Sequence, residues 1–141
     1  MSGPDVLVDT NIFVSARNRR ERGFGSCRKS LDPIDRGAFR EVVSVVTIAE
    51  IRAGLVPEEI PTTWRAMLTH LLTSPNYRVE AVNAEIAEAA GELRASSHLA
   101  LPDALIVATA QLRGASMIVT QDRELARSQK GLAIKSPEQV V

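Results

Sequence analysis

The feature that most constrains the fold is a set of short apolar segments, each followed by sequence with helical character. The segments VLV at 6–8, VVSVV at 42–46 and MIVT at 117–120 contain almost no polar residues. Continuous apolar runs of this length are typical of strands buried on both faces. Because helical segments follow them, these strands are expected to run parallel rather than to pair through hairpins. The sequence therefore predicts an α/β fold with a mainly parallel central sheet flanked by helices.

Two further strands and several helices complete the predicted order of elements. Strands are predicted at 77–82, with the sequence YRVEAV, and at AIK near the end of the chain. Helices are predicted to begin near residues 11, 31, 47, 62, 83, 103 and 123. The stretches 18–25 and 55–62 are predicted to be loops. No repeat or low-complexity tract is present, and 141 residues are the usual size of one domain, so residues 1–141 are expected to form a single domain.

Several common chemistries are not supported by the sequence. Cys27 is the only cysteine, so neither a disulfide nor a cysteine-based zinc site is expected within the chain. The two histidines, His70 and His98, show no metal-ligand spacing and have no evident nucleophile to serve. The sequence has no GK[ST] phosphate loop, no GxGxxG motif and no GxSxG elbow. These absences argue against nucleotide-binding and serine- or cysteine-hydrolase chemistry.

Charge and hydropathy patterns predict the environment of the protein. The 17 basic and 17 acidic residues balance, which argues against a protein that coats DNA by bulk electrostatics. The N-terminus lacks a charged leader followed by an apolar stretch, and no apolar run approaches 18 residues. We therefore expect a cytoplasmic protein with no membrane association.

Basic residues are concentrated between positions 17 and 29. This segment contains six basic residues and one acidic residue, which are Arg17, Arg19, Arg20, Arg22, Arg28, Lys29 and Glu21. A local positive charge of this kind attracts phosphates, which makes Arg17, Arg19, Arg20 and Arg22 candidates for RNA contact. A solvated surface loop is an equally good interpretation of the charge pattern alone.

Four acids follow the predicted strands or open the predicted helices. Asp9 comes directly after the first strand, and Asp122 comes two residues after MIVT. Glu50 lies one turn into the helix after VVSVV, and Asp103 lies at the first turn of an apolar helix. Ligands of open α/β sheets bind beyond the carboxyl ends of the strands. If the sheet is parallel, all four acids can therefore meet at one edge of it.

Each acid also has a purely structural interpretation, as a helix cap, a turn residue or an exposed helix residue. The surroundings favour a site, because Glu50 and Asp103 lie in apolar segments where a charge needs a partner. Clustered carboxylates repel one another and either bind protons or hold a hard divalent cation. Oxygen ligands suit Mg²⁺ or Mn²⁺, which activate water for phosphodiester hydrolysis. The acids therefore predict a metal-dependent phosphodiesterase.

Four motifs, in this order and spacing, resemble the PIN domain: VLVDTNIFV, VVSVVTIAEIRAGL, LPDALIVATAQLRGA and MIVTQDREL. The resemblance covers nearly the whole chain, and within the superfamily the chain is similar to VapC-type toxins of type II toxin–antitoxin pairs. It implies a PIN-like three-layer sandwich and an endoribonuclease that hydrolyses RNA with Mg²⁺ or Mn²⁺. It also implies a homodimer and a tight complex with a cognate antitoxin, whose C-terminal segment lies in a groove near the active site.

The resemblance also implies roles for particular residues. Its metal-binding and catalytic acids fall on Asp9, Glu50 and Asp103, with Asp122 more peripheral. The polar residues that assist these acids in the family fall on Thr10 or Asn11 in the first motif, and on Thr120 in the last. The Arg-rich segment has no counterpart from which a role can be transferred. The loop at 55–62 is a candidate border of the antitoxin groove.

Three other functions were weighed against a nuclease toxin. A receiver-like phosphoacceptor requires an acceptor aspartate after a middle strand and a lysine after a late strand, and the sequence has neither. A PIN-type binding module would be indicated by loss of one or more acids, but all four are present. A nuclease of RNA processing or DNA repair, outside a toxin–antitoxin pair, shares the same motifs. The small size and the lack of any extra domain favour the toxin, because stand-alone PIN chains of this length resemble that group most.

Overall fold

A five-stranded parallel sheet forms the centre of the computed structural model, which describes residues 3–128 and 132–140. The strands lie in the order β3-β2-β1-β4-β5, and every neighbouring pair is parallel. Their bounds are Asp5–Val8 (β1), Arg40–Ser44 (β2), Tyr77–Glu80 (β3), Met117–Val119 (β4) and Ala133–Lys135 (β5). This arrangement confirms the predicted α/β fold with a parallel sheet. The direction of winding reverses between β1 and β4, so the switch point of the sheet lies there.

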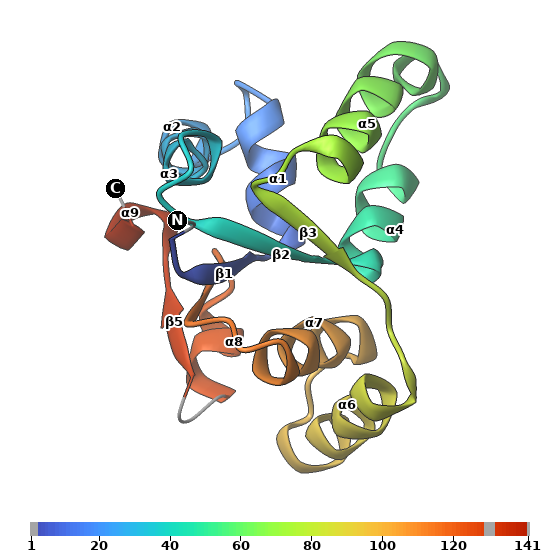
Figure 1. Ribbon diagram of the computed structural model, residues 1–141, viewed down its shortest axis with the longest axis vertical. Helices are drawn as coiled ribbons and strands as arrows, with labels where there is room; N and C mark the ends of the chain where they lie inside the picture. The colour runs from blue at the N-terminus through green and yellow to red at the C-terminus, as the bar shows by residue number, and fades with distance from the viewer. Residues whose placement is uncertain (1–2, 129–131, 141) are drawn as a thin grey trace.

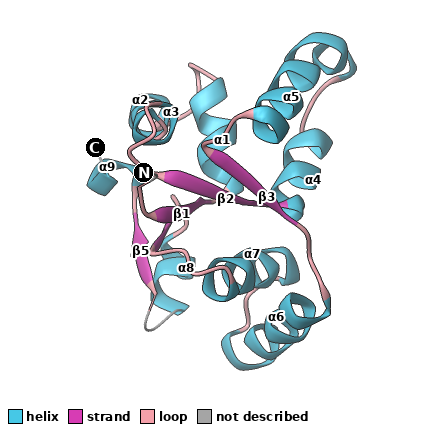
Figure 2. Ribbon diagram, in the orientation of Figure 1, coloured by secondary structure: helices cyan, strands magenta, loops and turns pink. Residues whose placement is uncertain are grey.

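Helices cover both faces of the sheet and make it the middle of three layers (Figures 1 and 2). Helices α1, α2 and α5 lie on one side of the sheet, and α6 and α7 lie on the other. The helices are α1 Thr10–Arg17, α2 Phe24–Ser30, α3 Asp32–Asp35, α4 Val45–Ala53, α5 Arg65–Thr73, α6 Ala84–Ser97, α7 Leu101–Leu112, α8 Arg123–Ser128 and α9 Pro137–Val140, with the short turns η1 Pro57–Glu59 and η2 Ile60–Trp64.

Side chains of β1 alternate between the two halves of the core. Val6 and Val8 pack with the cluster under α1, α2 and α5, whereas Leu7 packs with the cluster under α6 and α7. All three are at most 2% exposed, as expected for a strand covered on both faces. Such a strand has no polar face, which explains why the sequence showed a continuous apolar run and not an alternating one. Among residues 3–128 and 132–140, no helix has both the length and the apolar character needed to cross a bilayer.

The second strand ends earlier than the sequence pattern predicted. We expected a strand over 42–46, but β2 ends at Ser44, and Val45 and Val46 form the first turn of α4. The Ser44 hydroxyl oxygen accepts a hydrogen bond from the Val46 backbone N–H at 3.1 Å. This N-cap outweighs the preference of two valines for extended backbone. The helix predicted from Thr47 is therefore real but begins two residues earlier.

The segment between the first two strands contains more helix than predicted. The Arg-rich stretch was expected to be a loop through Gly25, yet α2 already begins at Phe24. The helix predicted near 31–37 is present only as the short α3, and the chain turns at Gly37 with φ of 80°. That backbone conformation suits glycine, as the predicted helix stop required. The predicted loop at 55–62 contains the short turns η1 and η2, and α5 begins at Arg65.

A carboxyl group is buried in the core on β2. Glu41 is 0% exposed, and neither of its carboxyl oxygens has a hydrogen-bond partner among the described residues. Burial raises the pKa of Glu41 well above its ordinary value, an effect that the nearby backbone of Val8 only partly opposes. Glu41 is therefore protonated in the folded protein at pH values where it ionises in the unfolded chain. This difference costs stability as the pH rises.

Replacing Glu41 with methionine is expected to stabilise the protein. Glu41→Met should raise the free energy of unfolding at pH 7 by about 1–3 kcal/mol, because it removes a buried polar group without a partner. The gain should grow as the pH rises from 4.5, the ordinary pKa of this carboxyl, toward its raised folded-state pKa. Urea unfolding at several pH values measures both effects. Glu88→Met on the exposed surface of α6 is the control, and an equal or negative change for Glu41→Met would contradict this account.

Candidate active site

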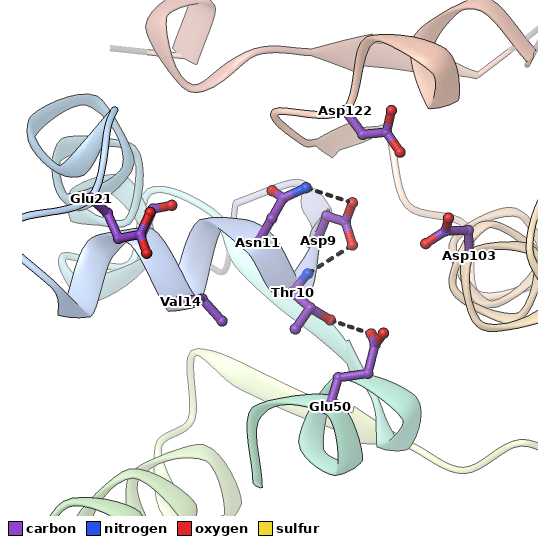
Figure 3. A pocket seen from close by; sticks show the side chains of 9 residues that line it. Asp9, Thr10, Asn11, Val14, Glu21, Glu50, Asp103 and Asp122 are labelled. Carbon is purple, nitrogen blue, oxygen red and sulfur yellow. Dashed lines mark hydrogen bonds between the residues drawn. The ribbon is translucent and has the colours of Figure 1, made fainter. Parts of the chain in front are cut away.

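Four acids from distant parts of the chain line one pocket of about 400 Å³ (Figure 3). Asp9 follows β1, Glu50 lies on α4, Asp103 lies in the first turn of α7, and Asp122 follows β4. Because the strands are parallel, their carboxyl ends share one edge, and the pocket lies at that edge beside the switch point between β1 and β4. The structure therefore brings together all four acids that the sequence singled out. Thr10 and Asn11 also line the pocket.

Asp9 lies at the centre of the site and is only 5% exposed. One of its carboxylate oxygens accepts a hydrogen bond from the Thr10 backbone N–H at 2.8 Å, so Asp9 also caps α1. The other oxygen accepts from the Thr120 hydroxyl at 2.8 Å and from the Asn11 amide at 3.3 Å. Asp9 is thus the helix cap of its structural interpretation and at the same time lines the acid pocket.

Burial raises the pKa of Asp9 above its ordinary value, and the negative charges of Glu50 and Asp122 raise it further. The hydrogen bonds from Thr120 and Thr10 act in the opposite direction without cancelling this rise. The pKa of Asp103 is also raised, first by burial and then by the charges of Asp9 and Asp122. The pocket therefore disfavours its own negative charge, which a bound cation would relieve.

Threonine hydroxyls fix the orientation of the acids. The Thr10 hydroxyl donates to a Glu50 carboxylate oxygen at 2.7 Å and lies 3.1 Å from the Thr47 hydroxyl. The Thr120 hydroxyl donates to Asp9 and accepts from the Asp122 backbone N–H at 3.0 Å. These contacts link α1 to α4 and the end of β4 to the end of β1.

Asp122 is partly committed to the helix that follows it. One of its carboxylate oxygens accepts from the backbone N–H groups of Glu124 at 2.9 Å and Leu125 at 3.4 Å, which places Asp122 at the N-terminus of α8. The Asp103 side chain makes no hydrogen bond to another described residue, so its carboxyl is the less constrained of the two.

Three residues that line the pocket, and one beside it, were not selected from the sequence: Val14, Ser15 and Glu21 in the lining, and Gln121 next to it. Glu21 lines the far side of the pocket, away from the other acids in Figure 3. Gln121 donates through its side-chain amide to the Ser15 hydroxyl at 2.9 Å and to the Asn11 carbonyl at 3.3 Å. Its backbone N–H donates to the Asn11 side-chain oxygen at 3.2 Å. The only available signal for Gln121 was its position between Thr120 and Asp122.

The four candidate RNA-contacting arginines separate in space. Arg17 pairs with Glu59 at 2.5 Å and lines a cavity that shares Val14 and Glu21 with the acid pocket. Arg19 and Arg20 are exposed on the turn after α1. Arg22 lines another cavity, which shares Asp122 with the acid pocket. Arg17 and Arg22 thus both line cavities beside the acids, but Arg17 is already engaged in an ion pair.

The donor set of the pocket suits a hard divalent cation. Among the residues whose side chains the structure describes, five carboxylates line it without any basic side chain, those of Asp9, Glu21, Glu50, Asp103 and Asp122. Oxygen donors of this kind match the preferences of Mg²⁺ and Mn²⁺. Within the described residues, no three His, Cys, Asp or Glu side chains already form a group that could hold a metal ion. The raised pKa values of Asp9 and Asp103, caused first by burial and then by neighbouring negative charge, show that ionisation of these two carboxyls is disfavoured.

Fold and site together define a parallel α/β protein with an acid-lined pocket at its switch point. The PIN-domain family matches the sequence over residues 6–131, so the chain belongs to this family of nuclease domains. No curated protein is significantly similar in sequence.

Solved structures share the fold at low sequence identity. FitAcB from Neisseria gonorrhoeae is 20% identical, with 94% of this chain and 97% of that chain covered and a TM-score of 0.69. A toxin–antitoxin complex from Klebsiella pneumoniae is 24% identical, with 94% and 97% covered and a TM-score of 0.67. VapC20 from Mycobacterium tuberculosis, described as a toxin that cleaves the sarcin–ricin loop, is 18% identical, with 91% and 96% covered and a TM-score of 0.71. The shared architecture extends over nearly the full length of each chain.

Neutralising Asp103 is expected to stabilise the metal-free protein. The raised pKa of Asp103 means that ionisation favours the unfolded state above pH 3.8, so Asp103→Asn should raise the melting temperature at pH 7.5 in chelator. In saturating Mn²⁺ the wild-type protein should have the higher melting temperature, because it binds the ion more tightly and is therefore stabilised more than Asp103→Asn. Differential scanning fluorimetry with and without Mn²⁺ measures both. If Asp103 were only a favourable charge at the start of α7, Asp103→Asn would lower the melting temperature in both conditions.

Proposed function

We propose that the protein is a metal-dependent endoribonuclease and the toxin of a toxin–antitoxin pair. The observation that carries this proposal is the acid pocket, in which Asp9, Glu50, Asp103 and Asp122 gather without a neutralising basic residue. A purely structural group of carboxylates would be expected to have cationic partners, as Asp5 does with Arg40 at 2.9 Å. An unneutralised group at the switch point of an α/β sheet instead suits an ion and its phosphate ligand.

In the proposed site, Asp9, Glu50 and Asp103 hold Mg²⁺ or Mn²⁺, and Asp122 acts from the periphery. When bound, the ion would lower the pKa of a water molecule and neutralise charge on the scissile phosphate. Thr120 and Asn11 hold one oxygen of Asp9, and Thr10 holds Glu50, so the polar side chains preorganise the acids. The capping bonds from Asp122 to α8 leave this residue less able to move toward an ion.

The substrate and partners follow from the family and from the structural relatives. PIN domains are nucleases, and the VapC20 relative is described as cleaving an RNA loop. Several relatives were solved as toxin–antitoxin complexes, among them VapBC2 from Rickettsia felis bound to promoter DNA. We therefore propose RNA as the substrate, a cognate antitoxin and a second copy of the chain as partners, and the cytoplasm as the location. An RNA-processing nuclease and a PIN-type binding module remain the alternatives that the test must separate.

Cleavage of total RNA by the purified protein tests this proposal. We expect discrete fragments in Mg²⁺ or Mn²⁺, no cleavage in chelator, and at least about 100-fold slower cleavage by Asp9→Asn. Mutating a residue that only hydrogen-bonds to a metal ligand typically lowers metal affinity or activity about 10–100-fold. Removing the charge of a proposed ligand itself should therefore slow cleavage by at least as much. Asp32→Asn, the same chemical change on the exposed face of α3, is the control and should cleave at the wild-type rate.

The outcomes distinguish the alternatives. Metal-independent cleavage, or equal cleavage by Asp9→Asn, would contradict the assigned site. A folded protein that cleaves no RNA in any metal would support the binding module. Growth arrest on expression of the wild-type chain, but not of Asp9→Asn, would support the toxin over a processing nuclease.

A further inference from the structure

A second cavity, of about 710 Å³, adjoins the acid pocket. Thr120 and Asp122 belong to its lining, and Asp122 also lines the acid pocket, so the two spaces share a wall. The rest of the lining comes from the turn before α2, the start of α8 and the segment from β5 to α9. Figure 1 shows α2, β5 and α9 on the same side of the molecule. A linear ligand held at the acids can therefore continue into this second cavity.

The two cavities differ in charge. Among the residues whose side chains the structure describes, the acid pocket is lined by carboxylates and by no lysine or arginine. The second cavity contains Arg22, Arg123 and Lys135 against Asp122 and Glu138. A strand that passes from the first cavity to the second therefore meets basic side chains in the second. A nucleic acid with one phosphate at the acids needs cations at its neighbouring phosphates, and this is where the chain provides them.

Arg22 and Lys135 are available for such a contact. Both are exposed, and neither forms an ion pair with another residue of the described chain. Other arginines of the protein are engaged, for example Arg17 with Glu59 and Arg113 with Glu80. Binding a phosphate at Arg22 or Lys135 therefore breaks no ion pair.

The lining of the second cavity suits the backbone of RNA rather than its bases. No aromatic residue lines it, and its apolar contribution comes from Ile134 and Pro137. Proteins that hold bases of single strands use aromatic side chains as stacking surfaces. Contacts from cations to phosphates carry no sequence information, so this cavity is suited to position any strand.

We propose that the RNA strand runs from the acid pocket into this second cavity, where Arg22 and Lys135 bind phosphates next to the scissile one. This inference rests on the proposed nuclease function and adds the path of the substrate. Gln121 lines the second cavity and donates to Ser15 and Asn11, which line the acid pocket, so it ties the loop after β4 to α1 and keeps the two cavities in fixed relation. Arg22 and Lys135 are thus binding residues of the substrate, and Gln121 is a positioning residue.

RNA binding by inactivated protein tests the path. Asp9→Asn serves as the parent, so that the strand is not cut, and fluorescence anisotropy follows a labelled single-stranded RNA between 50 mM and 300 mM salt. Adding Arg22→Gln or Lys135→Gln should each make the slope of log affinity against log salt less negative by about 0.7, the value for one phosphate contact with a single strand. At 50 mM salt this corresponds to about eightfold weaker binding. The loss should be equal on two RNAs of different sequence.

Arg36→Gln on the exposed turn before β2 is the matched control, since it removes one positive charge at the amino edge of the sheet, opposite the carboxyl edge where both cavities lie. Thermal unfolding verifies that all variants are folded. If the two variants bind RNA like the control while the parent binds well, the proposed path is wrong and the nuclease function stands. If they weaken binding of the antitoxin but not of RNA, the cavity belongs to the protein partner and the path is also wrong. If the wild type neither binds nor cleaves RNA, the proposed function itself fails.

Discussion

The hydrogen bond from Thr120 to Asp9 is the interaction on which the site depends. It joins the residue after β4 to the residue after β1 at 2.8 Å, across the point where the sheet reverses its winding. The same carboxylate caps α1, so one side chain fixes the direction of the helix and the geometry of the pocket. Burial of Asp9 raises its pKa and the negative charge of Glu50 raises it further, so the folded protein disfavours the ionised carboxylate at this position.

The fold was largely predictable because its strands are covered on both faces. Parallel strands of this kind leave continuous apolar runs such as 6–8, and the turn to the next helix follows within one or two residues. The boundaries were not predictable where a single contact decides them. Ser44 caps α4 and turns two valines into helix, and no pattern of hydrophobicity contains that hydrogen bond. The start of α2 was not predicted for a different reason: the glycines and charged residues around it are typical of a loop.

The acids of the site could be selected from the sequence because their positions follow from the topology. A parallel sheet places the residues after β1 and β4 at the same edge, and the spacing along the helices supplies Glu50 and Asp103. The polar contacts between loops could not be derived in this way. Gln121 reaches Ser15 only in the conformation that the loop after β4 adopts. Whether an arginine pairs with a carboxylate or stays free likewise depends on distant residues, as Arg17 and Glu59 illustrate.

The distribution of charge fits the proposed function, in which an acidic pocket serves a negatively charged substrate. In this proposal the carboxylates would hold the ion, and the basic residues one cavity away would share with it the neutralisation of the strand. The most direct test of this account is a crystal structure of the protein soaked in Mn²⁺, with the ion located by its anomalous scattering. The account predicts a peak bounded by Asp9, Glu50 and Asp103. A well-ordered pocket without a peak there, or an ion bound only elsewhere, would contradict it.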